Sequence, residues 1–460
     1  MKPLHTLQRF AARLHPVALL ALGFAALILI GMVFLSLPVS RAGTDPLPTI
    51  DALFTSTSAV CVTGLIVVDT GSFFSLFGQI VLLILIQIGG IGVMTLSVLI
   101  FRVIGKRISY RQRLIMQDVF TQAPRADIFR LVRSIAVFTL ITEGLGAILL
   151  FGFWVGEFPW PHALVLAVFH SVSAFCNAGF SLFSTSMITY ASNAYLNGVI
   201  LTLIILGGLG FPVIYELQQR LVSKKIRKQR LSVHSRTVLI TTVILILLGT
   251  LVFFTSEQFG ALKGKPLEEK VLISVFQSVT CRTAGFNSID TTKLHEATLT
   301  FMLFLMFIGA SPGSCGGGIK TTTLALLLAT AWSKFRGRSR AALFRRSLPS
   351  ATVIRGQALA LLALAVVMAS VFLLQFESHF ERVSPEGRDP FLSYLFETVS
   401  AFGTVGLSMG ASNKLTSFGK ILISILMFIG RVGVLSFAYM LTPTGRTVDI
   451  EYAEEDMMIG

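Results

Sequence analysis

FTSTSAVCVTGL, from Phe54 to Leu65, is the first of four related stretches in this sequence. The other copies are FHSVSAFCNAGF at 169–180, FQSVTCRTAGF at 276–286 and FETVSAFGTVGL at 396–407. Each begins with Phe, carries Ser or Thr two and four residues later, and ends in Gly followed by Leu or Phe. Their first residues are 115, 107 and 120 positions apart, so the unit is far longer than a solenoid repeat. The sequence therefore predicts one folded module that is repeated four times.

The first half of each copy is a short apolar run of about ten residues, whereas a helix that crosses a bilayer needs about 20. The second half (VTG, NAG, TAG or TVG) consists mostly of small residues and ends in Gly, which reaches backbone conformations closed to other residues. Non-helical backbone inside a membrane survives only where it is buried in protein or lines water. Four such loops around one axis would present rings of carbonyls to a passing ion. We therefore predict a re-entrant pore helix and a filter loop in each copy. The alternative is a duplicated helix–turn signal in which Gly is a C-cap.

The composition is typical of a membrane protein. Of 460 residues, 53% are hydrophobic and 13% are charged, whereas a soluble domain carries about 25% charged residues. Long apolar segments flank every copy of the stretch. They lie at 16–37, 74–101, 131–155, 195–217, 237–256, 298–330 (interrupted), 351–376 and 419–441. The predicted fold is an all-α integral membrane protein of eight transmembrane helices and four re-entrant pore helices around a pseudo-fourfold pore.

These segments divide the chain into four repeats, each with a first helix, a pore loop and a second helix. The expected boundaries are 1–105, 106–222, 223–335 and 336–460. The first repeat includes an N-terminal cytoplasmic segment, and the fourth includes a cytoplasmic tail.

The positive charges are concentrated on one predicted side of the membrane. Of the 38 Lys and Arg residues, 26 lie in the N-terminal segment, the tail and the loops 102–133, 220–236 and 334–355. Cytoplasmic loops carry such an excess, so both termini are expected in the cytoplasm. Because the basic residues flank membrane segments, contact with the bilayer explains the net charge of +15 better than nucleic-acid binding.

The second helix of the third module is interrupted. FMLFLMFIGA at 301–310 is apolar, and SPGSCGGG follows at 311–318. This run cannot hold a stable helix, because each Gly costs about 1 kcal/mol and Pro about 3 kcal/mol. We expect an intramembrane loop that gates permeation, with Lys320 holding it shut through carbonyl contacts. The alternative is a packing kink with a snorkelling lysine. The expected gate comprises Ala310, Ser311, Pro312, Gly313, Ser314, Cys315, Gly316, Gly317, Gly318, Lys320 and Arg431.

Arg431 lies in FIGRVG at 428–433, which echoes QIGGIG at 87–92 and ILGGLG at 205–210. A guanidinium near the pore would raise the barrier for a cation. It could instead neutralise Glu143 or cap the broken helix. Glu143 is itself a functional candidate, because an acid at membrane depth costs about 3 kcal/mol on insertion scales.

Other kinds of site find little support. The four cysteines form no Cys-x-x-Cys pair, and a small apolar role is favoured over metal binding. SPGSCGGGIKTT resembles a phosphate-binding loop, but it lies in a membrane span with no preceding strand. No nucleophile and base stand at helical spacing, so an enzyme is not expected.

Taken together, the four modules, one glycine per filter loop and the glycine-rich break resemble the Trk/Ktr/HKT superfamily of potassium transporters. The resemblance covers essentially the whole chain, and it is strongest to the membrane (KtrB-type) subunits of Ktr systems. Gly64 fits the glycine that accompanies potassium preference in the family, 310–318 matches the gate and Arg431 matches the pore arginine. Three of the four copies depart from TVGYG, which implies fewer strong ion sites. The implied ion-binding residues are Val62, Thr63, Gly64, Leu65, Asn177, Ala178, Gly179, Phe180, Thr283, Ala284, Gly285, Phe286, Thr404, Val405, Gly406 and Leu407.

The resemblance also implies an assembly. Such subunits are homodimers in the bacterial plasma (inner) membrane, and they sit on a cytosolic ring of nucleotide-binding RCK subunits. Potassium is then the substrate, and ATP or ADP binds the partner subunit. Whether sodium activates transport is left open by the resemblance. No cofactor is expected in this chain. The alternative function is a coupled secondary cation transporter with a broken-helix site at mid-membrane.

Overall fold

The structure, a computed structural model, describes residues 16–103, 128–222, 230–381 and 390–434. Within these ranges the chain is helical, apart from connecting loops and a small hairpin of β1 (Ala342–Leu343) and β2 (Arg346–Ser347). The predicted N-terminal cytoplasmic segment, most of the loop 102–133, the cytoplasmic tail and the placement of both termini lie outside the described residues.

A long helix, a short helix, a loop and a further helical segment follow one another four times in the described chain. The first group is α2 (Pro16–Ser36), α3 (Thr49–Val60) and α5 (Leu76–Val103). The second is α7 (Ile128–Trp154), α8 (Trp160–Phe175), α9 (Ala194–Gly208) and α10 (Phe211–Val222). The third is α12 (Val233–Glu257), α13 (Leu267–Thr280), α14 (Glu296–Phe307) and α15 (Thr321–Phe335). The fourth is α16 (Ser350–Glu381), α17 (Pro390–Gly403) and α18 (Ser417–Val432).

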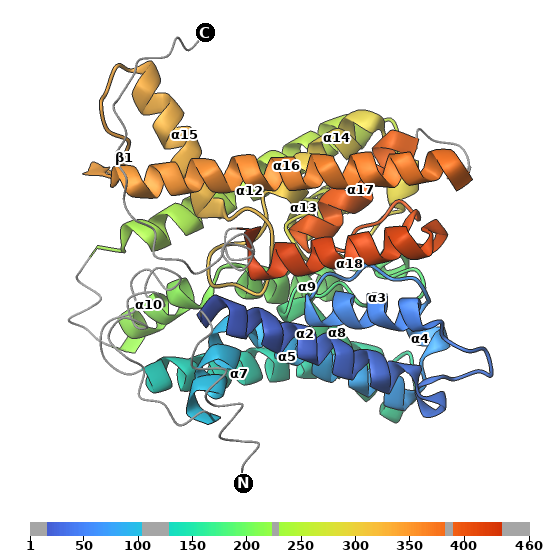
Figure 1. Ribbon diagram of the computed structural model, residues 1–460. Helices are drawn as coiled ribbons and strands as arrows, with labels where there is room; N and C mark the ends of the chain where they lie inside the picture. Colours follow the sequence, from blue (N-terminus) through green and yellow to red (C-terminus); the bar gives the residue numbers. More distant parts are fainter. Residues whose placement is uncertain (1–15, 104–127, 223–229, 382–389, 435–460) are drawn as a thin grey trace.

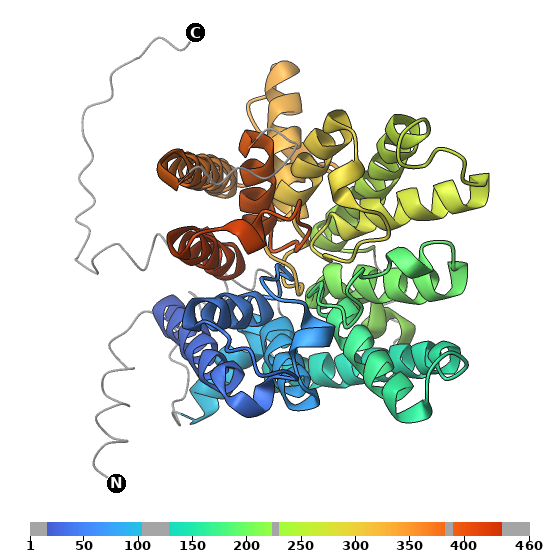
Figure 2. The same cartoon turned by 90° about the vertical axis from the view of Figure 1, so that its right-hand side faces the viewer.

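Short helical turns complete the connections. They are η1 (Pro38–Ser40), α4 (Thr70–Phe73), η2 (Ile188–Tyr190), η3 (Thr291–Lys293) and η4 (Ser412–Lys414). The four groups follow one another around a centre that their loops occupy, from blue through green and yellow to red (Figure 2).

Three helices in the described ranges are long and apolar enough to cross a membrane alone. They are Arg133–Trp154, Val233–Glu257 and Ser350–Glu377, within α7, α12 and α16. Large apolar side chains on these helices face outward: Leu140 is 66% exposed, Leu247 64% and Leu361 70%. An apolar exterior of this extent suits lipid rather than water. Shorter apolar helices are found at Ala21–Ser36, Leu76–Gly92, Trp160–Phe175 and Glu296–Phe307.

The expectation of one continuous segment at 195–217 is wrong. α9 and α10 meet at a break and are bent by 100°. Gly210 in this break has φ +90°, a conformation that favours glycine. The backbone N–H of Phe211 then donates to the carbonyl of Gly313, 2.9 Å away in the third module. A contact between modules therefore accompanies a bend that the apolar pattern does not indicate.

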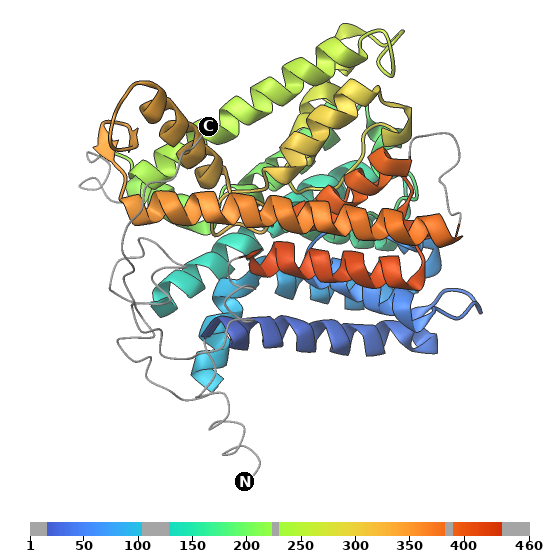
Figure 3. The ribbon, with the colours of Figure 1, turned by 45° about the horizontal axis from the view of Figure 1, so that its top comes forward.

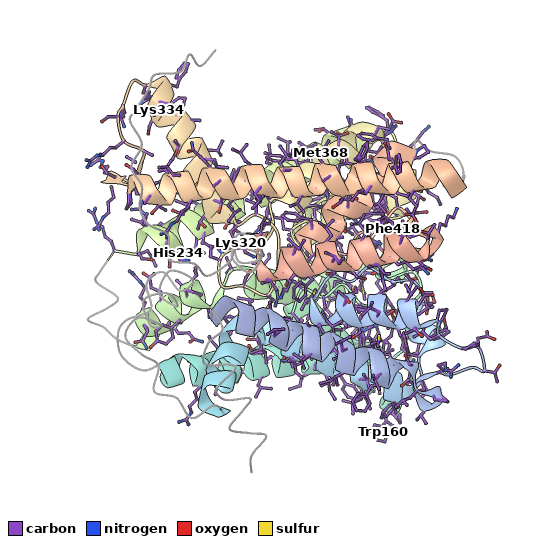
Figure 4. All side chains as sticks on the ribbon, viewed as in Figure 1. Trp160, His234, Lys320, Lys334, Met368 and Phe418 are labelled. Atoms are coloured by element: carbon purple, nitrogen blue, oxygen red, sulfur yellow. The ribbon has the colours of Figure 1, made fainter. Side chains whose placement is uncertain are left out.

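The interruption expected inside 298–330 is found between α14 and α15. The two helices run in different directions, and α15 leads away from the bundle toward the hairpin (Figures 1 and 3). The intervening residues, 308–320, return to the end of α14, because the backbone N–H of Ile319 donates to the carbonyl of Phe307 at 3.2 Å. Trp160 and Phe418 lie toward one end of the molecule, whereas His234 and Lys334 lie toward the other (Figure 4).

The first residue of every copy of the repeated stretch is a core residue. Phe54, Phe276 and Phe396 have no exposed surface, and Phe169 is 2% exposed. Full burial of an aromatic side chain contributes about 2 to 3 kcal/mol relative to exposure. The repeated Phe thus seats each short helix between its neighbours.

Candidate functional site

Each short helix ends in a loop with an unusual backbone. Its first residue has positive φ in all four copies, at Val62 (57°), Asn177 (58°), Thr283 (73°) and Thr404 (50°). The glycine two residues later also has positive φ, between 70° and 92°, at Gly64, Gly179, Gly285 and Gly406. The intervening residue does not. Two residues of positive φ thus flank one without it at the start of every loop. The four loops share this unusual backbone pattern although their sequences differ.

The four glycines form a closed ring. A Cβ atom built on Gly64 would lie 2.9 Å from the Cα of Gly179, and one on Gly179 would lie 2.9 Å from that of Gly285. A Cβ on Gly285 would lie 3.3 Å from the Cα of Gly406, and one on Gly406 would lie 3.0 Å from that of Gly64. Real Cβ atoms do not approach other atoms below 3.0 Å. Glycine is required here by space as well as by conformation, and the sixteen predicted filter residues belong to the four loops that meet at this ring.

The first hydroxyl of the repeated pattern ties the short helix to the preceding long helix. The Oγ of Ser56 donates to the carbonyl of Ile28 at 2.7 Å, and that of Ser171 donates to the carbonyl of Glu143 at 2.7 Å. The Oγ of Ser278 donates to the carbonyl of Ile246 at 2.8 Å. In the fourth copy, the equivalent hydroxyl of Thr398 is buried and has no hydrogen-bond partner in the described part of the chain.

Ser171→Ala is expected to lower the free energy of unfolding by about 1 kcal/mol, because it removes a buried hydrogen bond and leaves the carbonyl of Glu143 without that donor. Thermal unfolding of the purified protein in detergent measures the change. Thr398→Val is the matched control, since it removes a hydroxyl that makes no hydrogen bond, and it should cost little or raise the melting temperature. Equal losses in both variants would contradict this assignment.

The second hydroxyl of the pattern anchors the predicted filter loop. In the first and fourth copies, the Oγ of Ser58 and Ser400 accept from the backbone N–H of the loop glycine at 3.0 and 3.1 Å. In the second and third copies, the hydroxyls of Ser173 and Thr280 donate to the carbonyl after the glycine, each at 2.7 Å. The spacing of Ser and Thr in the sequence therefore reflects two separate anchors.

The third copy is shorter because its helix exit is tighter. In the other three copies, a backbone N–H in the loop donates to a carbonyl five residues earlier, as Thr63 does to Ser58 at 2.8 Å. In the third copy, the N–H of Ala284 donates to Thr280, four residues earlier, at 3.0 Å. One residue is omitted at the exit, and the loop still reaches the ring.

A further set of anchors was missed in the sequence analysis. The residue after the first Phe is polar in every copy, and in three copies it holds the outer arm of the loop. The Nε2 of His170 lies 3.0 Å from the Oγ of Ser181, and the Nε2 of Gln277 donates to the Oγ of Ser288 at 3.2 Å. The buried carboxylate of Glu397 accepts from the hydroxyls of Ser408 and Ser412 and from two backbone N–H groups. The repeated polar position was the available signal.

The loop 308–320, which the sequence predicts to be intramembrane, lies against the predicted filter residues. The backbone N–H of Gly317 donates to the Oγ1 of Thr404 at 2.7 Å. A Cβ on Gly316 would lie 2.1 Å from the Oγ1 of Thr283. The loop also contacts the end of α9, because the N–H groups of Ser311 and Cys315 donate to the carbonyls of Gly208 and Gly207 at 3.1 and 3.2 Å. The predicted gate segment is therefore packed directly against the first residues of two predicted filter loops.

Two cations hold this loop through carbonyl oxygens. The Nζ of Lys320 donates to the carbonyls of Gly316 at 2.6 Å and Gly317 at 3.1 Å. Lys320 is therefore bound to the loop rather than snorkelling to the membrane surface, and it lies near the end of α18 opposite Phe418 (Figure 4). Arg431, near the end of α18, donates from Nη1 to the carbonyl of Cys315 and from Nη2 to that of Gly89.

The suggested neutralisation of Glu143 by Arg431 is not found, since these two described residues form no ion pair. Glu143 is 6% exposed and accepts from the Nε2 of Gln87 at 3.1 Å. The thiol of Cys176 lies 3.7 Å from its other oxygen. Arg431 instead binds carbonyls of two segments: that of Cys315 in the break of the third module, and that of Gly89 in α5, just before the kink at Gly92.

The sequence analysis also missed a fourth echo of QIGGIG. It is FIGASP at 307–312, in which Gly309 occupies the place of Gly89. A Cβ on Gly89, Gly207 or Gly430 would lie 1.8 to 2.1 Å from a carbonyl at the end of the short helix of its own group, at Val60, Phe175 or Phe402. In the third group, a Cβ on Gly309 would instead lie 2.0 Å from the carbonyl of Gly317 in the intramembrane loop. The loop thus takes the place that a helix end has elsewhere.

Fold and site together define a class: a multi-pass helical membrane protein in which four short-helix loops close into one ring. The family model TrkH, described as a cation transport protein, matches residues 27–449. The chain therefore belongs to the TrkH family of cation transport proteins, which places it among transporters and not among enzymes. The resemblance drawn from the motifs is confirmed.

Relatives give the same assignment, and a solved structure agrees with it in fold. The Ktr system potassium uptake protein B of Bacillus subtilis is 39% identical, with 97% of each chain covered. The potassium/sodium uptake protein NtpJ of Enterococcus hirae is 37% identical, over 98% of this chain and 99% of the relative. The crystal structure of the potassium transporter TrkH from Vibrio parahaemolyticus has the same fold, with a TM-score of 0.71 and 21% identity. That match covers 92% of this chain and 85% of that chain.

Proposed function

We propose that this chain is the potassium-translocating subunit of a Ktr-type uptake system, in which ions pass through a filter made by the four loops. The observation that carries the proposal is the closed ring of Gly64, Gly179, Gly285 and Gly406. Glycine at every place lets four backbones meet with aligned carbonyls, which can replace the hydration shell of an ion. The B. subtilis relative is a potassium uptake protein and the E. hirae relative a potassium/sodium uptake protein, which supports potassium as the cargo.

The proposed membrane arrangement is eight transmembrane helices and four re-entrant pore helices, in repeats 1–105, 106–222, 223–335 and 336–460. The second helices of the modules are short, bent or broken in the described ranges. Non-helical backbone at membrane depth is tolerated where protein buries it or water surrounds it. Both termini would then lie in the cytoplasm of a bacterial cell, beneath the inner membrane.

The proposed gate is the intramembrane loop, held in a closed position by Lys320 and Arg431. Its support is the contact of Gly317 with Thr404 and of Gly316 with Thr283, which puts the loop against the first residues of the filter. Release of the carbonyl contacts would let the loop leave the path. Nucleotide control would act through a cytosolic RCK ring beneath a homodimer. The support for this assembly is the similarity to the B. subtilis protein, which is named as part of a Ktr system.

Flux out of liposomes that contain the purified chain tests the proposal. We expect rapid potassium movement under an outward potassium gradient with no sodium present, and slower sodium movement under an outward sodium gradient. Protein-free liposomes are the control, and added sodium tests activation. Potassium movement that requires a second ion in stoichiometric exchange would favour the coupled secondary transporter. Absence of cation movement under every gradient, even without residues 313–317, would show the proposal to be wrong.

A further inference from the structure

One residue of the third loop differs in charge from its equivalents in the other three. Three positions before the loop glycine, the first and second copies have Cys61 and Cys176, and the fourth has Gly403. The third copy has Arg282. Its side chain is 6% exposed, so a guanidinium is buried directly before the first filter residue, Thr283.

The partners of this guanidinium are neutral. Nη1 and Nη2 of Arg282 donate to the carbonyl and the hydroxyl of Thr242 on α12, at 3.4 and 3.5 Å. The Nε of Arg282 is buried without a hydrogen-bond partner in the described part of the chain. Among the described residues, Arg282 forms no ion pair. Arginine stays protonated in proteins, so the charge is present and is not cancelled by a neighbouring carboxylate.

The position of the charge relative to α13 sets its effect. Arg282 follows the C-cap of α13 directly. The C-terminal end of a helix carries a partial negative charge of about half an electron, and a cation there offsets it. The ends of α3, α8 and α17 have no charged residue at this position. The helices α3, α8 and α17 therefore direct a partial negative charge at the ring, whereas the negative end of α13 is neutralised by Arg282.

We propose that Arg282 is an affinity-setting residue of the filter: its buried charge, behind the third loop, weakens cation binding at the ring. This inference rests on the proposed function. An unequal ring binds a cation less tightly, and conduction requires that an ion leave the filter as well as enter it. Arg282 acts through its electric field, because the side-chain hydrogen bonds that it makes among the described residues go to Thr242 on α12 and not to a filter loop.

The test is the concentration dependence of potassium flux, together with block by barium, in liposomes containing the full chain. Arg282→Gln should lower the KM for potassium by about tenfold, because a unit charge acts strongly through a medium of low dielectric constant. Barium carries twice the charge, so the concentration that blocks flux should fall by about the square of that factor, about a hundredfold. Arg282→Lys keeps the charge and should stay within about twofold of wild type.

Matched controls separate this effect from others. Arg340→Gln removes an exposed charge far from the loops and should change neither constant. Arg282→Cys gives the third copy the residue that the first two copies have at this position. It replaces Arg282→Gln in the test if that variant does not fold. If the wild type and Arg282→Gln both transport potassium with the same KM, this inference is overturned and the proposed function is not. Equal factors for potassium and barium, or the same change in Arg282→Lys, would also overturn it by showing a packing effect. A wild type that moves no potassium would overturn the proposed function.

Discussion

Gly64→Ser is expected to reduce the preference for potassium over sodium by at least about tenfold, because it alters the ring at which the four loops meet. Gly64 has φ +92°, where a side chain costs about 1 to 2 kcal/mol. A Cβ there would lie 2.4 Å from the carbonyl oxygen of Ala178 and 2.9 Å from the Cα of Gly179. The neighbouring backbone must move, and with it a carbonyl predicted to bind the ion. The ratio of potassium to sodium flux in liposomes measures the change.

Gly410→Ser is the matched control for this variant. Gly410 also has positive φ, at 80°, but a Cβ at that position would meet nothing within 4 Å. It therefore carries the conformational cost without the contact at the ring. We expect Gly410→Ser to lower stability slightly and to leave the flux ratio unchanged. If both variants lost selectivity equally, backbone strain in the outer loops would explain the result and the ring contact would not.

Deletion of residues 313–317 is expected to raise the potassium flux by about tenfold, which corresponds to a closed state favoured by about 1.4 kcal/mol. The deletion removes the segment that contacts Thr283 and Thr404, and also the carbonyl of Cys315 that Arg431 holds. The flux ratio of potassium to sodium should persist, because the ring glycines are intact. Liposome flux of both ions, measured on one preparation, tests the two parts together.

A point variant tests the same gate with less disturbance. Lys320→Gln removes the ammonium that binds the carbonyls of Gly316 and Gly317 and should raise flux in the same direction. Lys334→Gln, on the exposed end of the same helix α15, is its control and should have no effect. A selective wild type whose flux does not change on deletion or in Lys320→Gln would leave the filter in place and show that the loop is not a gate.

Much of the fold could be predicted because the signal is local and repeated. The Phe, the two hydroxyls and the glycine each have one physical task in a module, and four copies show which positions are fixed. Phe54 fills a core site, Ser56 and Ser58 make two anchors, and Gly64 allows the close approach. The interruption at 311–318 was likewise evident from residues that cannot sustain a helix.

What could not be predicted depends on contacts between modules. The bend at Gly210 accompanies a hydrogen bond to Gly313, about a hundred residues later, and no local pattern indicates it. The sequence analysis left three roles open for Arg431, and in the structure it binds carbonyl groups from α5 and from the loop 308–320. The anchors at His170, Gln277 and Glu397 share polarity but not residue type, so the repeat obscured their common task.

The closed ring also has a consequence for biosynthesis. Gly64 and Gly406 touch although they lie 342 positions apart in the sequence. Three modules can form an arc, but its ends cannot join until the ribosome has made the fourth loop. Closing so long a span carries an entropic cost that shorter contacts avoid. We therefore expect the ring of glycines to be the last part of the molecule to form, after the individual helix pairs have entered the membrane.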